Sequence, residues 1–225
     1  MPSVNHASDP QDAEFLLEHP NAQSIHALKD QTKADFGDFL VVSPYAFQPH
    51  LLDLRTLEYS QNLLARALTL LKPVRTDYAT APYHESFNWA SVIDHLRFLN
   101  EEAGHFWSWQ HFYIVVFRSQ VPPTTNRVEL GELDEKAHAE ATQSGGLLKY
   151  WFGKPDENGR NLATCIWRKQ EDARPGSIGP GHKAATRATS SMYTEWKIER
   201  LAIVIEDGVS KWSIVPWEDF TDQES

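Results

Sequence analysis

A turn of the Asn-Gly type joins two short apolar segments in the second half of this chain, and it constrains the fold more than any other feature. The segments are residues 147–152 (LLKYWF) and 161–168 (NLATCIWR), and the connection between them contains Asn158-Gly159. Asn-Gly readily adopts positive φ, and two such runs on either side of it are typical of a β-hairpin. The sequence therefore predicts a sheet with at least one antiparallel pair.

Helix and strand patterns lie on both sides of this hairpin. Residues 111–119 (HFYIVVFRS) are aromatic and β-branched, as in a strand buried on both faces. Helices are predicted over 129–143 and from 182 to about 195, and a last strand over 198–206. The order βαββαβ is that of the ferredoxin-like unit. We therefore predict an α+β domain over residues 105–217.

The N-terminal part of the chain has a different character. Residues 1–35 are polar with few large apolar side chains, so we predict a disordered or loosely attached tail, and a second tail over 218–225. Between the N-terminal tail and the domain, residues 36–104 form a predicted helical extension. Its helices cover 56–71 and 89–103, where apolar residues recur at helical spacing.

Three further signals refine this extension. Residues 39–42 (FLVV) indicate a short strand or extended arm. Ser86 or Asn88 is a plausible N-cap for the second helix, because a short polar side chain can accept a hydrogen bond from a first-turn amide. Gly104 is the matching stop signal.

Composition excludes several classes of partner. The chain has 225 residues, a net charge of −10 and 41% hydrophobic content, so it is long enough to bury a sizeable core. We expect no nucleic-acid partner and no membrane, because both surfaces need clustered cations, and no apolar run approaches the roughly 20 residues that span a bilayer. One cysteine, Cys165, permits no intramolecular disulfide. With no secretory signal, a cytoplasmic location is expected, and the nucleus is compatible.

Aromatic residues are numerous and concentrate between residues 78 and 167. Eight Trp, seven Tyr and eleven Phe favour an aromatic-rich cavity or a large aromatic interface over an aliphatic core. A hydrophobic small molecule is therefore the expected partner. A homodimer is also expected, because a four-stranded sheet with helices on one face leaves its other face in need of cover.

Short motifs carry a resemblance to a known family. The strings YWFG at 150–153, NGRNLATC at 158–165 and GHKA at 181–184, with Trp167 and the block 77–89, resemble a fungal protein family that bears a placeholder name of the UPF type. That family brings no function with it.

A coarser pattern covers residues 111–206. It resembles the dimeric α/β-barrel superfamily, in which a strand ending in Trp precedes a short loop, a His at the start of the second helix and a last strand. The resemblance implies a ferredoxin-like fold. It also implies a function class that includes cofactor-free oxygenases, dehydratase-like and decarboxylase-like enzymes, and haem-binding proteins.

His182 is the first candidate for catalysis, because it begins a helix directly after Gly179-Pro180-Gly181. The positive end of a helix disfavours imidazolium, so a neutral ring there could act as a general base. A surface His that merely begins a helix is the alternative. Strand alternation places Thr164 and Arg168 on the opposite face from Cys165, and we predict that Arg168, Tyr150 and Thr164 orient a substrate.

Three hypotheses for function remain open. The first is an acid–base enzyme of the lyase, cyclase or cofactor-free oxygenase type that uses no metal and no cofactor. Such an enzyme could belong to secondary metabolism. The second is a non-catalytic protein that binds haem or another apolar ligand. The third is a coenzyme A-dependent acyltransferase, because the backbone amides of residues 176–181 (GSIGPG) could bind a phosphate, although a flexible connection is the favoured interpretation of this run.

Overall fold

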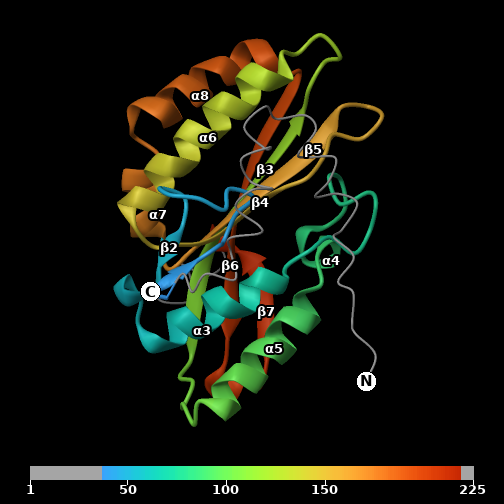
Figure 1. The fold of residues 1–225 in the computed structure, drawn as a ribbon. Coiled ribbons are helices and arrows are strands. Elements are labelled where there is room, and N and C mark those ends of the chain that lie inside the picture. The colour runs from blue at the N-terminus through green and yellow to red at the C-terminus, as the bar shows by residue number, and fades with distance from the viewer. Residues whose placement is uncertain (1–36, 219–225) are drawn as a thin grey trace, which may run out of the picture.

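The computed structural model describes residues 37–218, with the backbone alone at residues 189 and 190. The tail expected at 1–35 and nearly all of the tail expected at 218–225 lie outside the described residues. The described part is an α+β structure built on an antiparallel sheet with the strand order β4-β5-β3-β6-β7 (Figure 1).

The elements follow one another in two groups. The first group is β1 (Phe39–Leu40), β2 (Leu52–Asp53), η1 (Leu54–Thr56), α3 (Tyr59–Ala67), η2 (Leu68–Leu70), α4 (Tyr83–Ser86) and α5 (Trp89–Glu102). The second group is β3 (Gln110–Gln120), α6 (Arg127–Ser144), β4 (Leu147–Phe152), β5 (Arg160–Trp167), α7 (Gln170–Gly176), α8 (Pro180–Met192), β6 (Glu195–Ile205), η3 (Asp207–Val209) and β7 (Trp212–Pro216).

The second group contains the predicted ferredoxin-like unit. Strand β3 lies in the middle, antiparallel to β5 on one side and to β6 on the other, and β4 pairs with β5. At Val116, for example, the neighbours are Thr164 on β5 and Glu199 on β6. The βαββαβ order is therefore confirmed. Strand β7, which we did not predict, adds a fifth strand beside β6.

Each face of the sheet has its own core. On one face, Phe112, Ile114 and Val116 of β3 pack with helices α3 and α5. On the other face, Tyr113, Tyr150 and Trp167 pack with Ala141 of α6 and lie near Ala173 of α7. The predicted alternation along β5 is confirmed, since Leu162 and Ile166 belong to the first core and Ala163, Cys165 and Trp167 to the second.

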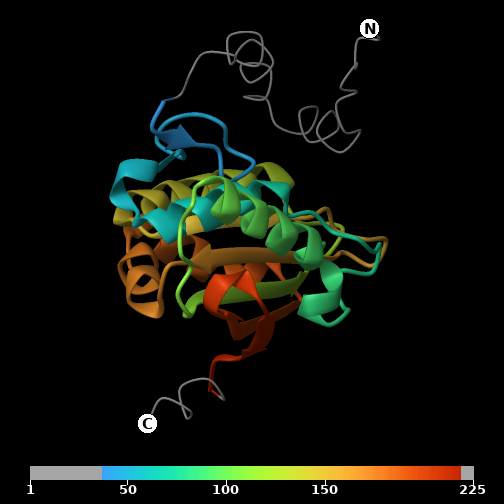
Figure 2. The same cartoon turned by 90° about the horizontal axis from the view of Figure 1, so that it is seen from below.

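The N-terminal extension covers the face of the sheet that we expected a second subunit to cover. Leu63, Leu64, Val92 and Leu96 of α3 and α5 share one continuous core with the sheet. Figure 1 shows α3 and α5 together, apart from α6 and α8, and Figure 2 shows α3 and α5 side by side from below. The physical reason for expecting a homodimer, an uncovered face on this side, is therefore wrong, and the homodimer itself stays a prediction.

Two local predictions about helices are corrected. Asn88 occupies the N-cap position of α5 but makes no side-chain cap bond. Its amide group instead accepts from the backbone N–H of Lys72 at 2.8 Å and donates to the carbonyl of Leu70 at 3.0 Å, tying α5 to the end of η2. Part of the run expected as a flexible connection is also helical, since α7 extends to Gly176.

Candidate active site

A group of polar side chains is buried between the sheet and helix α6. We call it the Asp134 cluster and define it as Tyr45, His50, Asp134, His138 and Tyr150. Asp134 and His138 are one helical turn apart on α6, Tyr150 is on β4, and Tyr45 and His50 come from the segment between β1 and β2. The amide of Tyr150 donates to the carbonyl of Val42 at 2.9 Å, and this bond fastens the segment to the edge of the sheet.

Asp134 accepts hydrogen bonds from two tyrosines. The hydroxyl of Tyr45 donates to Oδ2 at 2.6 Å, and the hydroxyl of Tyr150 donates to Oδ1. Burial raises the pKa of both tyrosines far above the ordinary value, and the charge of Asp134 raises it further. Both phenols therefore keep their protons at cellular pH. The carboxylate fixes the orientation of both rings.

His50 and His138 form a second pair in the cluster. Their Nδ1 atoms are 2.8 Å apart, and the rings stack with centroids 5.0 Å apart. Burial lowers the pKa of His50 to about 4; burial and then the charges of His50 and His182 lower the pKa of His138 to about 3. Both rings are therefore neutral at pH 7, and one Nδ1 donates to the other. Which ring donates depends on the tautomer.

His182, the first candidate from the sequence, lies beside this pair. It is close enough to His138 to lower its pKa, and its own pKa is lowered mainly by burial. Its ring also bonds to the backbone of Ala137 on α6. The Nδ1 atom of His182 and the Nε2 atom of His138 are both buried without a hydrogen-bond partner among the described residues.

The carboxylate of Glu140 occupies the amides at the start of α8. The N–H groups of Gly181 and His182 donate to its two oxygens at 2.6 and 2.9 Å. The amide of Gly181 is one of those that the third hypothesis offered to a phosphate, and the amide of His182 follows it directly. An anion from outside would meet a carboxylate there, so the interpretation of this turn as an open phosphate site is wrong.

The four predicted site residues do not share one site. Tyr150 and His182 lie at or beside the Asp134 cluster. Thr164 is on the opposite face of the sheet, where its hydroxyl is 2.9 Å from that of Tyr83. Arg168 pairs with Asp172 at 2.9 Å and donates to the carbonyl of Thr56 at 3.1 Å. Tyr150 is paired with Cys165 across the β4–β5 ladder, so the period-2 alternation of β5 places the neighbouring Thr164 on the face opposite Tyr150.

Sequence reasoning missed Tyr45, His50, Asp134 and His138. The spacing of Asp134 and His138, four positions apart on a predicted helix, was a usable signal, because such residues share a helix face. No local sequence pattern distinguishes Tyr45 and His50, which lie in the irregular segment before the first predicted helix. Cys165 lies beside the cluster, where burial raises the pKa of its thiol far above the ordinary value, so it stays protonated.

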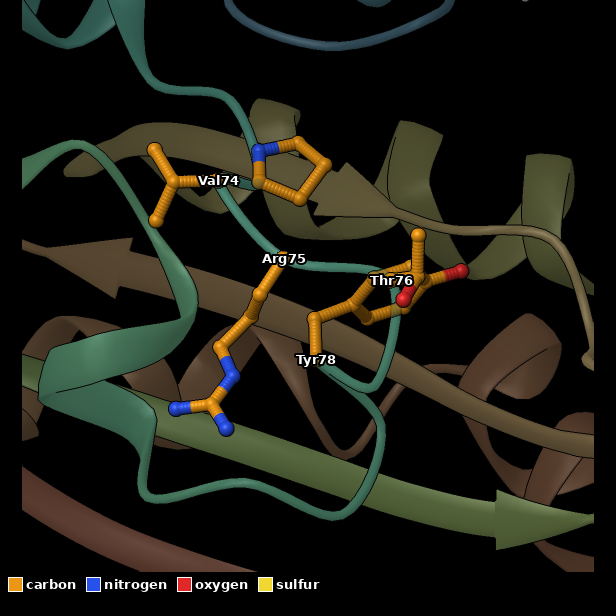
Figure 3. A pocket seen from close by; sticks show the side chains of 5 residues that line it. Val74, Arg75, Thr76 and Tyr78 are labelled. Carbon is orange, nitrogen blue, oxygen red and sulfur yellow. The ribbon is translucent and has the colours of Figure 1, made fainter.

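Two pockets open on the surface away from this cluster. The first, about 340 Å³, is lined by Pro73, Val74, Arg75, Thr76 and Tyr78 in the segment between η2 and α4 (Figure 3). The second, about 550 Å³, lies at the end of the sheet where β5 and β6 begin.

The second hypothesis included haem, and the residues of these two pockets do not fit it. Neither pocket is lined by His, Cys or Met, which are common haem ligands. Tyr78, the tyrosine of the first pocket, already donates its hydroxyl to the carbonyl of Lys154 at 2.6 Å.

Two negative findings apply to residues 37–218. No group of three or more His, Cys, Asp or Glu side chains is placed to hold a metal ion. No helix in this range combines the length and apolar character that a membrane span requires.

A family model described as PB2B2.08-like matches residues 41–216, which is most of the chain. The chain belongs to this family. A relative within it, UPF0643 protein PB2B2.08 of Schizosaccharomyces pombe, is 36% identical over 207 residues, covering 89% of this chain and 94% of the relative. The matched range contains every residue of the Asp134 cluster. The resemblance to a fungal UPF family is therefore confirmed.

Solved structures similar to this PB2B2.08-like chain cover a smaller part of it. Rv0793 from Mycobacterium tuberculosis is 13% identical, with a TM-score of 0.36, over 40% of this chain and 92% of its own. SnoaB, a cofactor-independent oxygenase from Streptomyces nogalater, is 14% identical, with a TM-score of 0.35, over 40% and 91%. A conserved protein from Methanosarcina mazei Go1 is 18% identical, with a TM-score of 0.36, over 40% and 89%. The ferredoxin-like assignment rests on the strand order itself.

Proposed function

We propose that the protein is a metal-independent acid–base enzyme that acts on a hydrophobic small molecule at the Asp134 cluster. The observation that carries this proposal is the neutral His50–His138 pair, with Nδ1 atoms 2.8 Å apart and with an Nε2 atom on His138 that has no hydrogen-bond partner within residues 37–218. Because burial lowers the pKa of His138 to about 3, its imidazole is neutral at pH 7 and this ring nitrogen can accept a proton, as a weak base that acts only while the substrate proton is being transferred.

The pair can relay a proton between its two outer nitrogens. If His138 removes a proton from a substrate through Nε2, it can release the proton on its Nδ1 to Nδ1 of His50. His50 can then lose a proton from its own Nε2. The net result is one proton moved from the substrate to the outer side of His50, with both rings neutral again in the exchanged tautomers.

The tyrosines would hold the substrate rather than exchange protons with it. Both phenols donate to Asp134, so each oxygen keeps lone pairs that can accept a hydrogen bond from a substrate hydroxyl. Phe47, Phe152 and Tyr113 lie in the same core and supply an apolar wall. A conjugated molecule with an enol or phenol group and an acidic C–H bond suits such surroundings. We assign His182, which lies close enough to His138 to lower its pKa, the role of a second proton acceptor.

The test is exchange of a substrate C–H proton with solvent. The protein is incubated in D₂O with a panel of hydrophobic ketones and polyphenols, and deuterium uptake into each compound is followed by mass spectrometry. General acid–base catalysis contributes about 10²–10⁴ in rate, so His138→Gln should lower the exchange rate at least about 100-fold for any compound that exchanges. His84→Gln, at an exposed histidine, is the matched control and should keep the rate.

Three outcomes decide the proposal. Exchange that depends on His138 supports it. Exchange that is equal in wild type and His138→Gln overturns the role of the pair. Binding of a panel compound without exchange favours the non-catalytic ligand-binding hypothesis and overturns the enzyme. A homodimer, a cytoplasmic location and a role in secondary metabolism stay predictions.

A further inference from the structure

The second surface pocket has a composition that the Asp134 cluster does not explain. It has a volume of about 550 Å³ and is lined by Ala79, Thr80, Arg118, Ser119, Arg160, Glu195, Trp196 and Lys197. Three of these side chains are cations and one is a carboxylate, in a chain whose net charge is −10. The volume lies within the range of about 300–1,000 Å³ that is typical of small-molecule sites.

Arg118 builds the pocket and has few donors left for a ligand. Its Nε donates to Glu199 at 2.7 Å, and its terminal nitrogens donate to the carbonyls of Ala79 and Ala81 at 2.6 and 2.8 Å. These bonds hold the segment before α4 against the end of β3. One wall of the pocket is therefore fixed in place.

Arg160 is the cation with unused hydrogen-bonding capacity. Its Nε is buried and has no hydrogen-bond partner among the described residues. A terminal nitrogen of Arg160 is 4.0 Å from the carboxylate of Glu195, and the Arg160 side chain is 43% exposed, so this ion pair is weak. Lys197 pairs with Glu199 at 3.3 Å and is also largely exposed. Together they offer an anion one guanidinium fork and one ammonium group.

Trp196 supplies a flat apolar surface beside these cations. Its residue is 42% exposed although its ring is large and apolar. The ring is supported by Phe117, with centroids 5.5 Å apart, and by Tyr193, with centroids 5.1 Å apart. An exposed aromatic ring that is held in position beside solvent-exposed cations is typical of a binding surface.

We propose that this pocket binds an aromatic anion, a planar ring carrying one carboxylate or phosphate group. The ring stacks on Trp196, and the anionic group is bound by Arg160 and Lys197, with the hydroxyls of Thr80 and Ser119 on the pocket wall. The proposal does not depend on catalysis at the Asp134 cluster, because the two sites share no residue.

The test uses three probes that differ only in their polar group: 2-naphthoate, 2-naphthyl phosphate and the neutral 2-naphthylmethanol. Isothermal titration calorimetry at low salt should give a Kd for at least one anion that is tenfold or more below that of the neutral probe. The anion that binds more tightly shows whether the pocket prefers a carboxylate or a phosphate group. Arg160→Gln should weaken anion binding about tenfold or more, since hydrogen bonds to charged groups are among the strong ones.

Matched variants keep the test falsifiable. Trp196→Ala should weaken the binding of all three probes, and Lys197→Gln should weaken the binding of the two anions only. Lys72→Gln, at an exposed lysine outside the pocket, should change nothing. His138→Gln should bind the probes as the wild type does, which separates this site from the proposed catalytic one. Equal affinity for neutral and anionic probes, or equal effects of Arg160→Gln and Lys72→Gln, would overturn the proposal.

Discussion

His50 and His138 are 88 positions apart in the sequence, and their Nδ1 atoms are 2.8 Å apart in the fold. Both rings are buried, and both are neutral at pH 7 because burial lowers their pKa values to about 4 and about 3. A neutral, hydrogen-bonded imidazole pair holds the segment between β1 and β2 against α6. Stability and the proposed chemistry therefore depend on the same two rings.

We expect the free energy of unfolding to fall as the pH drops below about 6.5. The unfolded histidines titrate near the ordinary value of 6.5, and the folded ones near 4 and 3. Between these values the unfolded state binds more protons than the folded state. The stability that the two neutral rings contribute is therefore fully present above pH 6.5 and is lost as the pH falls towards 3–4. The free energy of unfolding should fall by up to about 1.4 kcal/mol per pH unit for each ring. Urea unfolding from pH 7.5 to 4.5 measures this slope.

The controls for this pH dependence use one buried and one exposed histidine. His138→Gln should reduce the slope, and His84→Gln should leave it as in the wild type. An equal slope in all three proteins would assign the acid sensitivity to other groups.

We expect the bond between Tyr83 and Thr164 to show an asymmetric mutational pattern. The hydroxyl of Thr164 can donate to the carbonyl of Val115 at 3.2 Å and accept from Tyr83 at 2.9 Å. Thr164→Val leaves a buried phenol unpaired and should cost about 1–3 kcal/mol, whereas Tyr83→Phe should cost about 0.5–1.5 kcal/mol. The double variant should be more stable than Thr164→Val alone. A double-mutant cycle, with the free energies of unfolding measured in guanidinium chloride, tests this. Strictly additive losses of stability would contradict it.

We expect Gly159→Ala to be strongly destabilising. Gly159 has φ +76°, and an added Cβ would lie 2.1 Å from the carbonyl oxygen of Val121, a backbone atom that cannot move aside cheaply. The loss should be about 2–4 kcal/mol. Gly104→Ala is the control, since Gly104 has φ +58° and an added Cβ would have no atom of the described part of the chain within 4 Å, and it should cost only about 1–2 kcal/mol. Thermal unfolding of both variants distinguishes the clash from backbone strain, and equal losses would rule out the clash.

We expect Lys149→Met to stabilise the protein at pH 7. Lys149 is buried on β4, and burial lowers its pKa to about 8, so folding at pH 7 must desolvate a charge. The unfolded state binds more protons between pH 8 and pH 10.5, so wild-type stability should rise over that range. The variant should gain about 1–3 kcal/mol at pH 7 and lack the rise. Lys72→Met is the exposed control, and a destabilised Lys149→Met would refute the argument.

Most secondary structure could be predicted from the chain, because it follows from local periodicity. Strand β4 has the predicted bounds, and β5 differs by one residue at each end. Helix α7 and strand β7 were missed for local reasons. Helix α7 contains Pro175 and ends at Gly176, and β7 is a five-residue strand that ends in a proline. In both places, proline or glycine within or at the end of the element weakens the sequence pattern on which a prediction depends.

What the sequence by itself determined is the βαββαβ order, the alternation along β5 and the family. What only the tertiary structure decided is which polar groups meet. Tyr45 and Asp134 are 89 positions apart, and the loop that carries Tyr45 has no signal of its own. Thr164 and Tyr150 looked like one site and lie on opposite faces. Periodicity reports which side of an element is buried, but the partner across the core is decided by how distant segments pack, and no local pattern contains that information.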